Sequence, residues 1–386
     1  MEYQKIKNLL CRLLECPSIS PNNAGCLEIV ASELDGFNLQ RIDLADTANL
    51  FASYGQGFPH ICFVGHIDVV PANPAEWTSN PFIPTERDGK IFARGAADMK
   101  SGVAATVIAA KHLAELMERE KITGTVSLLI TSDEEATGLN GIAAVMPILE
   151  KRGIKIDYAI VAEPTARENL GDCARKGRRG SLNLELEILG IEGHIAYPEK
   201  LCNPIFPLAE ILTRLGEIVW DAGYLEFPPT SCQVSNFQAG LGAENIVPRT
   251  ATAKINWRFN PLYTEEKIRS IVEKIVAEVC EKSSTTANFS WRLSGDSFAT
   301  ADEIICDALS DAVKQNLAHT LEFNTAGGTS DGRFLAKHGA KVVEFGVCNA
   351  SIHKADEWVK IQDLEPLSKI YFDCAQNIFN HFKNTK

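Results

Sequence analysis

The sequence lacks any C-x-x-C pair, although eleven cysteines occur among its 386 residues. Cysteine pairs at that spacing are typical of structural zinc sites, so their absence argues against a zinc–thiolate site. The odd number of scattered cysteines, and the absence of a basic and apolar leader at residues 1–5, favour reduced thiols in a cytoplasm over a disulfide framework. We expect most of these cysteines to fill the core and the protein to be cytoplasmic.

Long apolar runs and an excess of basic residues are also missing. No run approaches the roughly 20 apolar residues that a membrane helix needs, so we expect no membrane association. The 38 basic and 50 acidic residues give a formal net charge of −12, which argues against a nucleic-acid-binding surface. Hydrophobic residues make up 45% and charged residues 23%, as in ordinary globular proteins, and the length suits two domains.

Short apolar segments alternate with helical patterns in the first part of the chain. This alternation favours an open, mostly parallel sheet flanked by helices, and the continuous apolar character of the strands fits burial on both faces. We predict strands at 61–65, 126–131, 158–162 and 341–345, and helices at 3–15, 102–117, 141–151, 302–316 and 363–382.

The hydrophobic period changes after Gly180. Leu182, Leu184, Leu186 and Ile188 alternate with polar residues, as in a strand with one solvated face. A helix at 204–219, strands at 230–238 and 249–259, a helix at 264–280 and a strand at 287–292 follow. This β-α-β-β-α-β order indicates a ferredoxin-like α+β domain. We therefore predict an α/β domain of residues 1–179 and 294–386, with residues 180–293 inserted as a second domain.

Histidines and acidic residues follow the predicted strands of the first domain. Because the carboxyl ends of strands in an open α/β sheet form its ligand crevice, we expect these side chains to converge. Two histidines with several carboxylates favour zinc or a similar transition ion over magnesium, and so predict a hydrolase site for two metal ions. The residues in this pattern are His66, Asp68, Asp98, Glu134, Glu135, Glu163 and His353.

Each of these motifs also has a simpler interpretation. Asp98 precedes a predicted helix and could be its N-cap, and residues 133–135 could form a solvated acidic first turn. Three adjacent acids repel one another unless cations offset their charge, however, and such a site needs both a ligand and a free carboxylate to accept a proton. The carboxylate of Asp68 could accept the second N–H of His66 and fix its tautomer.

The segments 65–71, 94–100, 131–136 and 163–164 resemble the di-zinc aminoacylase and carboxypeptidase family, and the resemblance extends from about residue 5 to the C-terminus. It implies a di-zinc exopeptidase-like catalytic domain with two zinc ions, for which cobalt can substitute. His66, Asp98 and Glu163 would hold one ion, and Asp98, Glu135 and His353 the other. Glu134 would be the general base, Asp68 would orient His66, and the peptide bond after Asp98 would be cis.

The resemblance also implies a homodimer formed through the inserted domain, which would act as a lid. His194 and Asn245 would cross the dimer interface, and His194 would stabilise the oxyanion in the partner's site. Segments 177–181, 193–198, 291–295, 327–334 and 350–354 narrow the resemblance to members that hydrolyse N-succinyl-LL-2,6-diaminopimelate to succinate and LL-2,6-diaminopimelate, a step toward lysine.

This substrate carries three carboxylates, and an acidic protein needs local positive charge to bind it. Arg178 could clamp one carboxylate and Arg258 a second, although the cluster at 175–179 could also be a solvated basic turn. By resemblance, further polar contacts would come from Ser181, Tyr197, Asn245, Gly328, Thr329 and Asn349. The family pattern is not kept at 174–179 and 203–206. Alternatives are an acetylornithine deacetylase, a dipeptidase, or a non-catalytic metal-binding protein on the same fold.

Overall fold

A computed structural model describes residues 2–136 and 138–383. Its internal contacts divide the chain into two units. Unit 1 contains residues 1–177, 299–324 and 330–386, and unit 2 contains residues 178–298 and 325–329. These bounds differ by a few residues from those expected from the sequence, and they place 325–329 with the inserted segment. The assignment of a catalytic and a lid domain stays a prediction.

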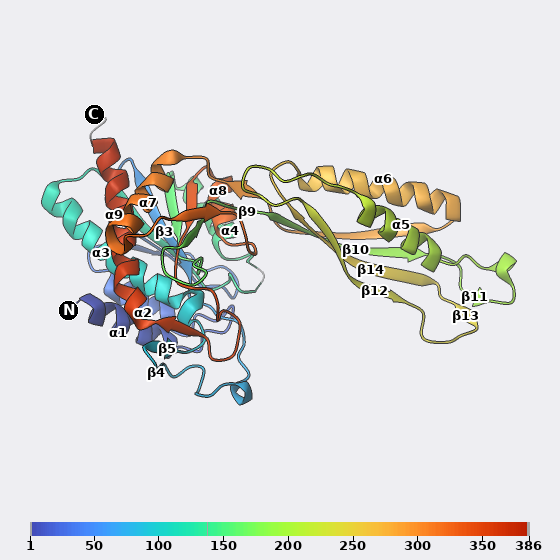
Figure 1. The fold of residues 1–386 in the computed structure, drawn as a ribbon, viewed down its shortest axis with the longest axis horizontal. Helices are drawn as coiled ribbons and strands as arrows, with labels where there is room; N and C mark the ends of the chain where they lie inside the picture. The colour runs from blue at the N-terminus through green and yellow to red at the C-terminus, as the bar shows by residue number, and fades with distance from the viewer. Residues whose placement is uncertain (1, 137, 384–386) are drawn as a thin grey trace. The chain divides into compact units, whose positions relative to one another are not determined.

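The centre of unit 1 is an eight-stranded mixed sheet (Figure 1). Its four middle strands, β6, β3, β7 and β18, are mutually parallel, whereas β1 and β2 add an antiparallel edge. β3 and β6 are buried along their whole length, as their continuous apolar sequences predict. In sheet order the strands are β1 (Asn38–Arg41), β2 (Asn49–Gln56), β6 (Gly124–Thr131), β3 (His60–His66), β7 (Tyr158–Val161), β18 (Lys341–Glu344), β8 (Cys173–Arg175) and β17 (Glu322–Asn324).

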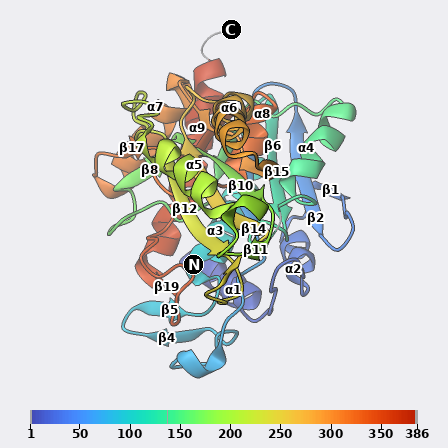
Figure 2. The same cartoon turned by 90° about the vertical axis from the view of Figure 1, so that its right-hand side faces the viewer.

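Helices cover this sheet in two groups (Figure 2). α3 packs against α1 and α9, and α9 also packs against α7, while α4 packs against α8. Buried residues of α1, α3 and α9 form one core with the strands. The helices are α1 (Glu2–Leu14), α2 (Cys26–Glu33), α3 (Ser101–Glu120), α4 (Ile142–Lys151), α7 (Glu303–Leu317), α8 (Gly332–Lys337) and α9 (Leu364–Lys383). A small sheet of β4 (Thr85–Arg87), β5 (Lys90–Phe92) and β19 (Trp358–Lys360) joins two distant segments.

Unit 2 has the predicted ferredoxin-like order. β10 (Gly180–Leu189), α5 (Ile205–Glu217), β12 (Ser231–Ala239), β14 (Thr250–Phe259), α6 (Glu265–Ser283) and β15 (Thr286–Gly295) follow one another. The strands form an antiparallel sheet in the order β12-β14-β10-β15. Residues along β10 and β14 alternate between buried and accessible, because α5 and α6 cover only one face. A two-stranded ribbon of β11 (Gly193–His194) and β13 (Ile246–Val247) extends beyond the sheet.

All eleven cysteines are free, and six of them are buried. None of the helices formed by residues 2–136 and 138–383 combines the length and the apolar character that crossing a membrane requires.

Candidate metal centre

The ends of four neighbouring parallel strands place the predicted ligands at one edge of the sheet. His66 ends β3, Glu134 and Glu135 follow β6, and Glu163 follows β7. His353 lies in the segment after β18, with a positive φ of 59°. Since β6, β3, β7 and β18 are parallel neighbours, their carboxyl ends meet at this edge. Residues scattered over nearly 300 positions therefore meet in one site.

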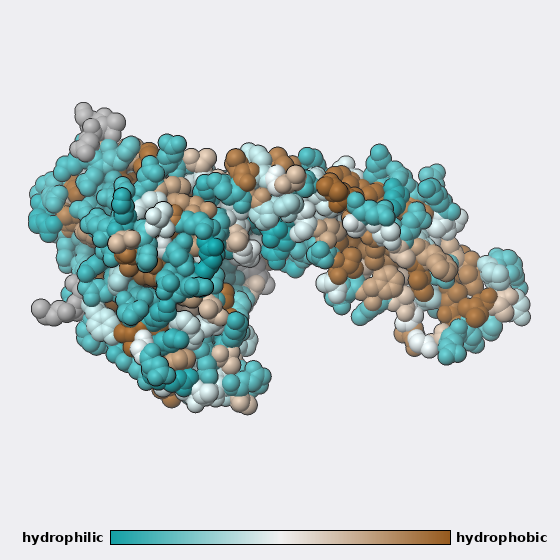
Figure 3. Space-filling model, viewed as in Figure 1, coloured by the Kyte–Doolittle hydropathy of each residue, from teal (hydrophilic) through white to brown (hydrophobic). Residues whose placement is uncertain are grey.

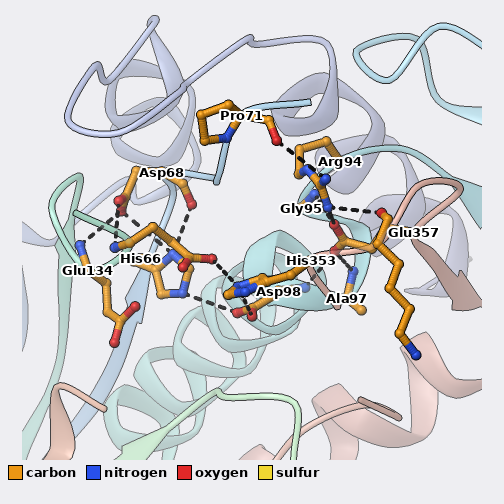
Figure 4. A network of polar contacts seen from close by, with 12 residues as sticks. His66, Asp68, Pro71, Arg94, Gly95, Ala97, Asp98, Glu134, His353 and Glu357 are labelled. Carbon is orange, nitrogen blue, oxygen red and sulfur yellow. Dashed lines mark hydrogen bonds and ion pairs between the residues drawn. The ribbon is translucent and has the colours of Figure 1, made fainter. Parts of the chain in front are cut away.

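Two groups of side chains that could each hold a metal ion meet at this edge. The ligand atoms of His66, Asp98 and Glu163 all lie within 4.8 Å of one another, and so do those of Asp98, Glu135 and His353. Asp98 belongs to both groups, with Oδ1 3.3 Å from His66 Nε2 and Oδ2 3.4 Å from His353 Nε2 (Figure 4). Its two oxygen atoms thus face two different histidines, as a bridging carboxylate requires.

An unusual backbone presents the shared carboxylate. Gly95 has a φ of 84°, in the left-handed region, and a Cβ there would lie 2.7 Å from Val69. Asp98 follows in a one-turn helical segment, Ala96–Lys100, where its own φ and ψ of −117° and 96° are not helical. The Asp98–Met99 peptide bond is cis, as the family resemblance implied. The interpretation of Asp98 as a simple helix N-cap is wrong, because α3 starts at Ser101 and has no side-chain cap from Asp98.

Unpaired polar atoms indicate that this cluster fits cations. Among the described residues, His66 Nε2 and Asp98 Oδ1 are buried without a hydrogen-bond partner, although they lie 3.3 Å apart. Burial raises the pKa of Glu163 well above its usual range, and the nearby carboxylates Asp98 and Glu134 add to this effect. Carboxylates that raise one another's pKa need nearby positive charge to stay ionised. The donor set of imidazole and carboxylate suits zinc or a similar ion.

The pKa values of the two histidines are also raised, but in an imidazole a raised pKa favours the charged form. Burial alone would lower the pKa of His66, but Asp98 and Asp68 outweigh it and hold that pKa well above the usual range. Hydrogen bonds to Asp98 and Glu135 raise the pKa of His353 to about 10. His353 Nε2 lies only 2.9 Å from Glu135 Oε1. Without metal ions, protons on the two imidazoles offset the negative charge that cations would otherwise neutralise.

Asp68 has a different contact from the one expected. His66 Nδ1 lies 2.9 Å from the backbone carbonyl oxygen of Asp68 and 3.6 Å from its carboxylate, so the expected carboxylate acceptor was wrong in detail. The fully buried carboxylate instead accepts the backbone N–H groups of Glu134 at 3.3 Å and Glu135 at 3.0 Å. One residue therefore orients His66 through its carbonyl group and the acidic turn through its side chain.

Glu134 lies beside the ligands but belongs to neither group. Burial raises its pKa to about 8, and the carboxylates of Asp331 and Glu135 add to the effect of burial, while His66 opposes it. A carboxylate with a raised pKa, next to a cluster of ligands, is placed as a proton acceptor requires. Asp331 is itself buried, with a pKa raised to about 6 by burial, and sequence reasoning did not single it out.

Sequence reasoning also missed Glu357 and Arg94, which support the turn that carries Asp98. Glu357 is 1% exposed and accepts hydrogen bonds from the backbone of Gly95, Ala97 and Asp98. Its distance of only four residues from His353 was the one available signal. No periodic pattern connects Glu357 with residues 94–98, so the sequence alone could not show that it contacts them.

The predicted substrate-binding residues of unit 2 gather at the Gly180 end of β10. Arg178 is buried and donates from Nη1 to the carbonyl oxygen of Ala326 at 3.0 Å. Gly327, directly before the predicted Gly328 and Thr329, has a φ of 103°, in the left-handed region that favours glycine, and a Cβ there would lie 2.2 Å from this Nη1. On the adjoining strands, Ser181 is opposite Arg258. Burial and then the charge of Arg179 lower the pKa of Arg258, as in a concentrated basic cluster.

The remaining predicted residues lie elsewhere. In unit 2, His194 on β11 is opposite Ile246 on β13, and the Ile195 N–H donates to the carbonyl oxygen of Asn245 at 3.2 Å. His194 is exposed, and its ring centroid lies 5.9 Å from that of Tyr197. This group lies beyond the Leu189 end of β10, whose ten residues separate it from Arg258 by about 30 Å. Asn349 is in unit 1, where its N–H donates to the carbonyl oxygen of Ala166.

Comparisons with known proteins show which family and which fold this chain resembles. Residues 62–377 match the sequence model of peptidase family M20/M25/M40. The succinyl-diaminopimelate desuccinylase of Bordetella parapertussis is 42% identical, over 98% of this chain and 99% of its own length. That of Thioalkalivibrio sulfidiphilus is 44% identical over 94% and 96%. The crystal structure of Bacillus subtilis YXEP, a dinuclear metal-binding peptidase, has a TM-score of 0.75 and 16% identity, covering 98% of each chain.

Proposed function

We propose a hydrolytic function for this chain, which belongs to peptidase family M20/M25/M40. The substrate is N-succinyl-LL-2,6-diaminopimelate, and the products are succinate and LL-2,6-diaminopimelate. The observation that carries this proposal is the pair of metal-binding groups that share Asp98, with Glu134 beside them. Relatives with desuccinylase activity that align over nearly the full chain favour the succinyl substrate over other N-acyl amino acids.

The two groups would each hold one zinc ion. His66 and Glu163 would bind the first, Glu135 and His353 the second, and Asp98 both. Cobalt prefers similar nitrogen and oxygen ligands and could replace zinc. When bound, the two ions would supply a water molecule of lowered pKa and positive charge opposite the developing oxyanion.

The protein's own groups complete the reaction. Glu134 takes a proton from the attacking water as the new C–O bond forms at the succinyl amide carbonyl. The C–N bond then breaks, and Glu134 returns the proton to the leaving amine. Asp68 keeps the Glu134–Glu135 turn in place, because its carboxylate accepts both backbone N–H groups. The positions of the proposed base Glu134 and the proposed ligand Glu135 thus both depend on the buried carboxylate of Asp68.

Positive charge in unit 2 would bind the carboxylates of the substrate. Arg178 and Arg258 would each clamp one of them, since guanidinium groups bind carboxylates through two hydrogen bonds. Ser181 lies opposite Arg258, and Asn256 donates to its Oγ at 3.1 Å, which leaves its hydroxyl proton available to an acceptor. Further polar contacts would come from Tyr197, Asn245, Gly328, Thr329 and Asn349.

We also propose a homodimer formed through unit 2. Val234 and Phe237 are 42% and 45% exposed on β12, whose second edge is unpaired in the described chain, and Figure 3 shows apolar residues on this part of unit 2. Exposed apolar edges of this kind are typical of interfaces. Because the length of β10 separates His194 from Arg258, both can contact one substrate only if His194 comes from the partner copy. His194 would then stabilise the oxyanion there.

The decisive experiment measures succinate release from N-succinyl-LL-2,6-diaminopimelate with zinc added. N-acetylornithine and dipeptides are assayed in parallel at equal concentrations. The proposal predicts the highest kcat/KM for the succinyl substrate. Faster cleavage of acetylornithine would reassign the substrate, and zinc-loaded protein without activity on any of these compounds would refute a hydrolytic role. Lysine biosynthesis in the cytoplasm is the setting that this activity implies.

A further inference from the structure

We propose that Glu357 and Arg94 act as a pair of positioning residues that set the geometry of the metal centre. They would do so by holding the turn that carries Asp98 against two other ligand-bearing segments. This inference rests on the proposed metal centre, but it concerns two residues that do not belong to either group of ligands.

The carboxylate of Glu357 accepts four hydrogen bonds, all from residues of one turn. Oε1 accepts the backbone N–H groups of Ala97 and Asp98, each at 2.9 Å. Oε2 accepts the N–H of Gly95 at 3.0 Å and Nη1 of Arg94 at 2.8 Å (Figure 4). All four donors come from five consecutive residues. The position of the Asp98 backbone, and hence of its side chain, is therefore fixed by Glu357.

Arg94 extends this support to the other ligand-bearing segments. Its Nη1 also donates to the carbonyl oxygen of Lys354 at 3.2 Å, directly after His353. Its Nη2 lies 3.5 Å from the carbonyl oxygen of Pro71, in the segment that follows His66. The Arg94 side chain is 5% exposed, so solvent screens these contacts little. One guanidinium group thus connects the segments that carry Asp98, His353 and His66.

The surroundings of Glu357 disfavour the charged form of its carboxylate. Burial raises the pKa of Glu357, and the charge of Asp98 nearby adds to that effect, although the backbone donors oppose it. The turn needs an acceptor, because its residues have left helical geometry at Asp98 and Met99 and cannot all bond within a helix. Glutamine could not replace Glu357, because its NH2 group would face N–H donors where an oxygen is needed. The requirement for a full carboxylate points to precise placement of Asp98 and not to packing alone.

The test compares Glu357→Gln and Arg94→Lys with the wild type, all as full-length protein. Zinc affinity is measured by competition with a chromophoric chelator, cobalt geometry by the visible absorption spectrum, and folding by thermal unfolding of the metal-free protein. Loss of a residue that holds a metal ligand weakens metal binding by about 10–100-fold. We expect Glu357→Gln to fall in this range, to alter the cobalt spectrum, and to lower kcat with little change in KM.

Arg94→Lys keeps the charge beside Glu357 but cannot also reach Lys354 and Pro71. We expect it to weaken zinc binding less than Glu357→Gln. The matched control is Glu33→Gln in unit 1, which also removes a carboxylate that accepts from two cations, Arg12 at 2.6 Å and Lys111 at 3.2 Å. Because this carboxylate pairs away from the ligand cluster, its loss should leave zinc affinity and the cobalt spectrum unchanged.

The outcomes separate the two proposals. Wild-type protein that binds no zinc would refute the metal centre itself. Wild-type protein that binds two zinc ions, with Glu357→Gln binding them equally tightly and giving the same cobalt spectrum, would overturn the positioning role. If Glu357→Gln does not fold, Arg94→Lys decides the question, and unchanged zinc affinity in that variant overturns the inference.

Discussion

Replacing Glu134 with glutamine should abolish turnover and leave the metal ions in place. Glu134 belongs to neither ligand group, and glutamine has nearly the same shape. The contact that fixes the turn is the Glu134 backbone N–H to Asp68 at 3.3 Å, which the substitution does not touch. Glutamine cannot accept a proton from water, so the change removes the proposed base alone.

The size of the effect follows from the role of the base. A positioned general base contributes about 10²–10⁴-fold to a rate. This loss corresponds to roughly 3–5 kcal/mol of activation free energy, at about 1.4 kcal/mol for each tenfold change. We therefore expect kcat to fall by at least about 100-fold. KM should change little, because Glu134 acts on the water and not on the carboxylates that bind the substrate.

The assay combines succinate release with the metal content of each purified variant. Glu135→Gln is the matched control, because Glu135 belongs to one ligand group and its loss should lower zinc content as well as activity. If Glu134→Gln retains two zinc ions and turns over at nearly the wild-type rate, Glu134 is not the base. If it loses zinc as Glu135→Gln does, its assigned role should be changed to that of a ligand.

Three further predictions address the dimer, the substrate and the metal-free protein. Mixing inactive His194→Ala and Glu134→Gln proteins under subunit exchange should restore about a quarter of wild-type activity. Half of the dimers would then be mixed, and each mixed dimer would have one complete site. If no activity is recovered, His194 acts in the site of its own subunit and not in the partner's. Arg178→Ala should raise KM about 10–100-fold at unchanged zinc content, measured by steady-state kinetics. The thermal stability of metal-free protein should fall as the pH rises from about 5 to 8. In this range Glu134, whose pKa is about 8 in the folded protein, keeps a proton that the unfolded chain has already released. A thermal stability that rises with pH over this range would contradict the prediction.

The strongly periodic parts of the fold were predictable from the sequence. Each predicted helix and strand corresponds to an element, and the continuous apolar run of β3 correctly indicated burial on both faces. Short or exposed elements were missed, because their existence depends on partners elsewhere in the chain. Within the part of the chain that the structure describes, β1 is almost wholly exposed and pairs only with β2, and α2 spans eight residues without a side-chain cap. Such elements have little apolar pattern of their own.

The convergence of the candidate ligands was predictable for a physical reason that does not extend to the residues that support them. His66 ends β3 and Glu163 lies two residues after β7, so the sheet alone brings them together. The contact between Arg94 and Glu357 spans 263 positions and depends on how two loops return to each other. Gly327 likewise lies against the side chain of Arg178, 149 positions earlier. No periodicity relates such residues, and only the folded structure shows that they are in contact.

Asp68 and Glu357 show that the candidate centre uses one structural device twice. Each is a buried carboxylate that accepts successive backbone N–H groups from a turn that carries a ligand, Glu135 in one case and Asp98 in the other. A turn held in this way moves its side chains little, because charged hydrogen bonds to backbone are stronger than neutral ones. In the proposed centre, neither carboxylate would need to contact a metal ion to control where the ions bind. In the proposed centre, the H-x-D spacing at His66 combines a candidate ligand with a support, Asp68, whose side chain acts at the end of β6 and not at the end of β3, where it lies.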